Sequence, residues 1–106
     1  MVTAPIIAVD LDGTLAQYHS WDGNVGAPVP MMVARVQDWL QLGYKVVIHT
    51  ARVAALHLDE ATGDEITEAT QQHEIIDAWV KANVWPDGLE ITSVKTMDMV
   101  EMWDDR

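Results

Sequence analysis

The chain contains 106 residues and no cysteine. This absence excludes a disulfide framework, a thiolate nucleophile and a zinc site built from thiolates. No apolar run is long enough to span a membrane. The first apolar stretch stops at Asp10 and has no basic segment before it, which is unlike a signal peptide. We therefore expect a soluble, cytoplasmic protein that does not enter a membrane.

Basic residues are also scarce. Lys and Arg total 6 against 17 Asp and Glu, which gives a net charge of −11, and no two basic residues are adjacent. Binding to a nucleic-acid backbone or an anionic membrane requires clustered Lys and Arg, so the charge argues against both partners. A small phosphorylated substrate, held by one or two cations and a metal ion, remains compatible with this composition.

The chain is nevertheless rich enough in hydrophobic residues, at 49%, to fold as a single domain over residues 1–106. Four short apolar or β-branched segments are predicted to be strands: residues 6–9, 44–49, 89–94 and 100–103. Helices are predicted from Pro30 to about Gly43, from the capping-box pair Thr62 and Glu65 onward, and over residues 96–99. Strands that alternate with helices predict an α/β fold with a parallel sheet.

The residues with reactive side chains follow the predicted strands. In parallel sheets, ligands bind beyond the carboxyl ends of the strands. At these ends the sequence places Asp10 and Asp12, Thr50 and Arg52, Lys95, and Asp104 and Asp105. Two carboxylates as close as those of Asp10 and Asp12 repel each other unless a cation or a shared proton lies between them. The pattern therefore favours metal-assisted chemistry.

The order Asp10-Leu11-Asp12-Gly13-Thr14, then Thr50 in His-Thr-Ala-Arg, then Lys95, then Asp104-Asp105 resembles the haloacid dehalogenase (HAD) superfamily of phosphohydrolases. Within it, the chain looks like small phage and bacterial members. The resemblance implies a Rossmann-like three-layer α/β/α sandwich with a minimal cap or none. Members usually continue beyond the Asp-Asp pair with a helix and often a strand, whereas this chain stops at Arg106. We therefore expect a C-terminally short domain with an exposed sheet edge, through which a homodimer could pair.

The resemblance also implies roles for individual residues. Asp10 would be the nucleophile and Asp12 the general acid/base. Mg²⁺ would be bound by Asp10, the main-chain carbonyl of Asp12, Asp104 and Asp105. Phosphate would be bound by Thr50, the Ala51 backbone and Lys95. Arg52 is either a further phosphate contact or part of a structural salt bridge, and His49 is expected in the core or behind the site.

These roles together imply a Mg²⁺-dependent phosphatase that hydrolyses a small phosphomonoester through an aspartyl-phosphate intermediate. An aspartate at position 12 favours phosphatase over dehalogenase chemistry, which has no alkoxide to protonate. One alternative is a catalytically silent module that binds phosphate or metal. Another is a nucleic-acid end phosphatase, against which the net charge argues. A phosphoacceptor receiver domain is disfavoured, because Lys95 precedes the final acids instead of following them.

Overall fold

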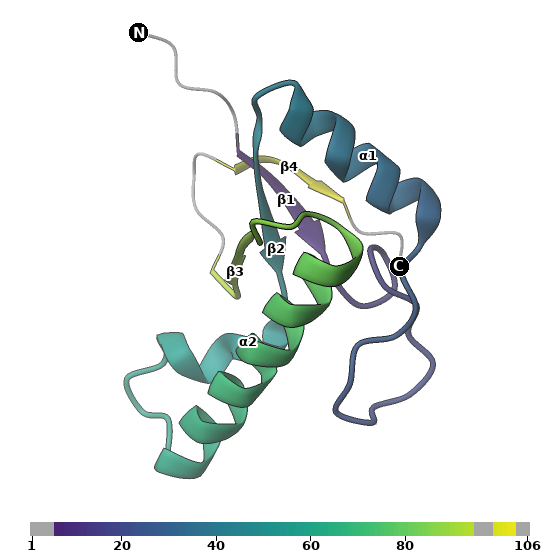
Figure 1. Ribbon diagram of the computed structural model, residues 1–106. Helices are drawn as coiled ribbons and strands as arrows, with labels where there is room; N and C mark the ends of the chain where they lie inside the picture. The colour runs from purple at the N-terminus through teal and green to yellow at the C-terminus, as the bar shows by residue number, and fades with distance from the viewer. Residues whose placement is uncertain (1–5, 95–98, 104–106) are drawn as a thin grey trace, which may run out of the picture.

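The computed structural model describes residues 6–94 and 99–103, and of residues 99–103 only the backbone is described. The described strands form one parallel sheet in the order β3-β2-β1-β4 (Figure 1). Their bounds are β1 Ile6–Asp10, β2 Lys45–His49, β3 Glu90–Thr92 and β4 Met99–Trp103. The protein is thus a small α/β protein with a parallel sheet, an arrangement compatible with a Rossmann-like fold.

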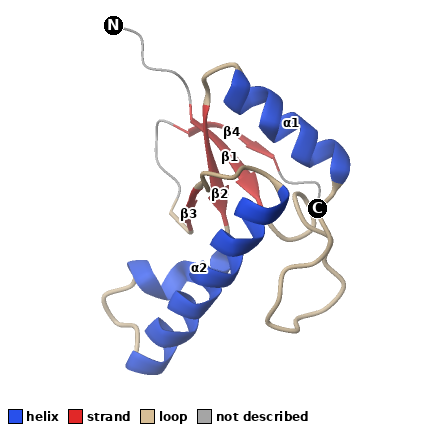
Figure 2. Ribbon diagram, viewed as in Figure 1, coloured by secondary structure: helices blue, strands red, loops and turns tan. Residues whose placement is uncertain are grey.

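Helices connect the first three strands, as Figure 2 shows. Helix α1, Pro30–Gln41, leads from β1 to β2, and it begins with proline at a position where no helical N–H is needed. A 3₁₀ helix, η1 Ala51–His57, and the long helix α2, Gly63–Asn83, lead from β2 to β3. Among the described residues, no helix is long and apolar enough to cross a membrane.

The hydrophobic core lies between one face of the sheet and both α-helices. The register pairs Ile7 with Val46 and Val9 with Ile48, so these four side chains share a face. They belong to one buried cluster with Val36 of α1 and with Ile76 and Val80 of α2. Right-handed crossovers that advance in one direction, from β1 to β2 to β3, place their helices on the same face.

The described residues therefore supply one helical layer. The expected three-layer sandwich needs a second helical layer, which α1 and α2 do not supply. The short helix predicted over residues 96–99 lies outside the described residues except for Met99, which instead begins β4.

The predicted strands are confirmed with shifted ends. β1 extends through Asp10, β2 begins at Lys45, and β3 covers only three of the six residues predicted. Helix α1 ends before Gly43, whose φ of +94° is a conformation that glycine adopts without steric cost. The capping box is confirmed, since Thr62 and Glu65 exchange both of its hydrogen bonds. The 3₁₀ helix was not predicted, because its residues have no clear periodicity.

Candidate active site at the carboxyl edge of the sheet

The side chain of Asp10 lies at the end of β1 and is buried, with 7% of the residue exposed. The register pairs Asp10 with His49 and His49 with Thr92, so these residues form a row across the ends of three strands. His49 Nδ1 lies 3.4 Å from Asp10 Oδ1, and its Nε2 lies 3.1 Å from the carbonyl oxygen of Ser93. His49 thus stands behind the site, as expected, in direct contact with the carboxylate of Asp10.

A tight turn follows Asp10 and leads to Asp12. The backbone N–H of Leu11 still donates to the carbonyl of His49, so pairing with β2 continues one residue beyond β1. Gly13 has a φ of +83° and donates its N–H to Ala16 at 2.8 Å. This left-handed conformation favours glycine over residues with a side chain. The turn brings the carboxylate of Asp12 into the reach of Arg52.

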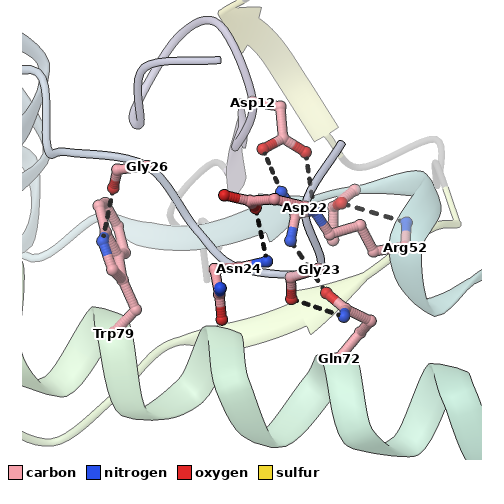
Figure 3. A network of polar contacts seen from close by, with 9 residues as sticks. Asp12, Asp22, Gly23, Asn24, Gly26, Arg52, Gln72 and Trp79 are labelled. Carbon is pink, nitrogen blue, oxygen red and sulfur yellow. Dashed lines mark hydrogen bonds and ion pairs between the residues drawn. The ribbon is translucent and has the colours of Figure 1, made fainter. Parts of the chain in front are cut away.

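Arg52 and Asp12 form a bidentate ion pair (Figure 3). Arg52 Nε donates to Asp12 Oδ2 at 2.9 Å, and Nη2 donates to Oδ1 at 2.7 Å. The side chain of Arg52 is only 6% exposed, whereas that of Asp12 is 21% exposed. Of the two interpretations that the sequence left open for Arg52, the described contacts are those of the salt bridge.

Two residues that the sequence did not assign to the site complete the surroundings of Arg52. Its Nη1 donates to Gln72 Oε1 of α2 at 2.9 Å, and Gln72 Nε2 donates to the carbonyl of Gly23 at 2.9 Å. The guanidinium carbon lies 4.6 Å from the centre of the Trp21 ring. Gln72 carried one signal in the sequence, because a glutamine on an otherwise apolar helix face needs a polar partner. The sequence placed Trp21 in a loop beside the expected cleft but favoured a solvated loop residue, because single aromatic residues in loops are common.

Thr50 and Ala51 join β2 to η1. The Thr50 hydroxyl caps η1 by accepting from the backbone N–H of Arg52 at 3.2 Å, and the Thr50 N–H donates to Thr92 at 2.9 Å. Thr50 is buried, with 6% of the residue exposed. Ala51 begins η1, and the first N–H groups of a helix have no partner within it. Both residues therefore offer hydrogen-bond donors at the same sheet edge as Asp10.

The remaining predicted site residues, Lys95, Asp104 and Asp105, lie outside the described residues. Strand β4 ends at Trp103, which pairs with Val9, so β1 and β4 end at the same edge of the sheet. Among the side chains that the structure describes, within residues 6–94, no three from His, Asp or Glu gather as a metal site would require.

The metal donors that the resemblance implies are all oxygens. They are the carboxylate of Asp10, the main-chain carbonyl of Asp12 and the two acids that the sequence places after β4. This chemistry suits Mg²⁺, which prefers oxygen ligands and retains several waters.

The structure brings Asp10, Asp12, Thr50 and Arg52 to one edge of the sheet. Comparisons with models of protein families, with curated proteins and with solved structures gave no match.

Proposed function

We propose that this protein is a Mg²⁺-dependent phosphatase of the HAD type, which hydrolyses small phosphomonoesters through an aspartyl-phosphate at Asp10. The supporting observation is the convergence of two differently held carboxylates at one sheet edge. Asp10 is buried beside His49, and Asp12 is held by Arg52. Carboxylates in such different surroundings suit different roles, one as nucleophile and the other as proton carrier.

In the first step, a carboxylate oxygen of Asp10 attacks phosphorus, and the bond from phosphorus to the ester oxygen breaks. The departing oxygen takes its proton from Asp12, which is left as a carboxylate. In the second step, Asp12 takes a proton from water as the water oxygen attacks phosphorus. The bond to Asp10 breaks, and inorganic phosphate leaves with the Asp10 carboxylate restored.

Other groups at the edge hold the reactants. The imidazole of His49 contacts one oxygen of Asp10 and so limits rotation of the nucleophilic carboxylate. The Thr50 hydroxyl oxygen accepts from the backbone N–H of Arg52. The proton of the same hydroxyl can be donated to a phosphate oxygen. Asp10 and the carbonyl of Asp12 would hold Mg²⁺ together with Asp104 and Asp105. A bound Mg²⁺ supplies positive charge against the phosphoryl oxygens.

The test is hydrolysis of p-nitrophenyl phosphate by the purified chain with Mg²⁺. We expect turnover that EDTA abolishes and that Asp10→Asn reduces to background, because the amide is a poor nucleophile. Asp38→Asn changes an exposed aspartate on α1 and is the matched control, with activity expected to stay at the wild-type level. A folded, Mg²⁺-loaded protein that is inert towards a panel of phosphomonoesters would refute the proposal.

A second candidate is a module that binds phosphate or metal without catalysis. The observation in its favour is the ion pair itself, since both oxygens of Asp12 already accept from Arg52. This candidate requires Mg²⁺ to raise the melting temperature by binding only the folded chain, with no turnover of any substrate. The same panel, run beside a thermal melt with and without Mg²⁺, separates the two.

A further inference from the structure

Three nitrogens of the Arg52 guanidinium donate to side chains of the protein. Two donate to Asp12 and one to Gln72, and one face of the group lies against Trp21. The side chain of Arg52 is only 6% exposed, and a guanidinium bonded in this way is fixed in orientation. To bind phosphate directly, it would have to give up contacts with Asp12 or Gln72.

We propose that Arg52 is a positioning residue, which orients Asp12 for proton transfer, and that Gln72 in turn fixes Arg52. This inference rests on the proposed phosphatase function. A bidentate pair sets the plane of the carboxylate as well as its position. Each carboxylate oxygen has two acceptor sites, so an oxygen of Asp12 that is bonded to Arg52 keeps one site for the leaving group or water.

Gln72 suits this role because its amide has both a donor and an acceptor end. The oxygen faces Arg52 and the nitrogen faces the Gly23 carbonyl, as Figure 3 shows. Gln72 is 6% exposed and lies on α2, a helix whose other buried residues pack in the core. The orientation of Arg52 is thereby tied to a rigid element.

The loop over residues 17–28 is attached to the same network. Its base is closed by hydrogen bonds from Gln17 to Ala27 and from Val29 to Leu15. Trp79 of α2 donates to the carbonyl of Gly26 at 3.0 Å, three residues from the contact between Gln72 and Gly23. The loop is fastened to α2 at these two points (Figure 3). It also carries Trp21, whose ring lies against Arg52.

Leaving-group dependence tests this role. p-Nitrophenolate leaves readily without a proton, whereas an alkoxide such as that of glycerol 2-phosphate needs one. We expect Arg52→Lys and Gln72→Met to lower kcat/KM for glycerol 2-phosphate by about 100-fold, the usual cost of a misplaced catalytic group. For p-nitrophenyl phosphate the loss should stay below about tenfold, because general acid catalysis contributes least there.

Gln72→Met keeps the length of the side chain and leaves both bonds between Arg52 and Asp12, so it serves if Arg52→Lys does not fold. Gln71→Met, one residue earlier on the exposed side of α2, is the control and should leave both substrates unaffected. Equal losses on the two substrates would overturn the inference while leaving the phosphatase function intact, as would no loss on either. A wild-type protein inert on both substrates would overturn the function and the inference together.

Discussion

At the scale of single residues, the two acids of the opening motif differ in their partners. Asp10 meets His49 from the neighbouring strand, and Asp12 meets Arg52 from the following 3₁₀ helix. The sequence predicted that Asp10, Asp12, Thr50 and Arg52 would converge, because parallel strands bring their carboxyl ends to one edge. The sequence could not predict the contact between Arg52 and Asp12, because this contact depends on the orientation of η1, which carries Arg52.

Gly26 shows how closely the loop is packed. A Cβ at this position would collide with the backbone carbonyl oxygen of Gln17. We expect Gly26→Ala to lower the free energy of unfolding by about 1–3 kcal/mol, the usual cost of forcing atoms into a packed region. Urea unfolding measures the change.

Gly63→Ala is the control for this substitution. Gly63 begins α2, and a Cβ there meets no atom within 4 Å. Alanine at such a site should raise the free energy of unfolding by up to about 1 kcal/mol. If the two alanine variants had the same stability, the packing described for the loop at Gly26 would be wrong.

At the scale of elements, local signals predicted the helices better than the sheet. Both helix starts could be predicted because they depend on residues close in the sequence. Thr62 and Glu65 form the capping box of α2, and Pro30 occupies the first position of α1. Gly88 precedes β3 with a φ of +78°, a conformation that glycine adopts without steric cost. β3 was predicted too long, because Leu89, Ser93 and Val94 fit a strand pattern but lie outside the pairing with β2.

The capping box has a pH dependence that can be measured. Two hydrogen bonds with Thr62 lower the pKa of Glu65 below its ordinary value. The larger effect comes from the backbone N–H of Thr62 and the smaller from the Thr62 side chain. Because the folded-state pKa is the lower one, the stabilisation is fully present above the ordinary value of about 4. It is lost as the pH falls through the folded-state pKa.

Glu65→Gln isolates this contribution, since the amide still accepts from Thr62 but does not titrate. We expect the wild type to be the more stable protein at about pH 6 and its advantage to shrink towards about pH 3. Glu68→Gln, at an exposed position on α2, should show a smaller dependence. A difference between wild type and Glu65→Gln that is independent of pH would contradict the role of the Glu65 charge.

At the scale of the whole molecule, the strand order β3-β2-β1-β4 explains the placement of both the core and the site. Two crossovers in one direction place both α1 and α2 on the same face of the sheet. The ends of β1, β2 and β4 meet at the edge that carries Asp10. The sequence predicted which segments are strands, but not which strands are neighbours, since that depends on long-range packing.

The overall charge agrees with the proposed substrate class. A net charge of −11 repels long polyanions, while a small phosphomonoester needs only local compensation at the sheet edge. Every part of the proposed chemistry depends on one claim, namely that a carboxylate oxygen of Asp10 receives the phosphoryl group.

Borohydride trapping tests this claim most directly. The protein is quenched during turnover of p-nitrophenyl phosphate, reduced, digested and analysed by mass spectrometry. An acyl phosphate on Asp10 is reduced to homoserine, so we expect homoserine at residue 10 in the presence of substrate and none in its absence. Hydrolysis that proceeds while residue 10 remains aspartate, or homoserine at Asp12 instead, would contradict the account.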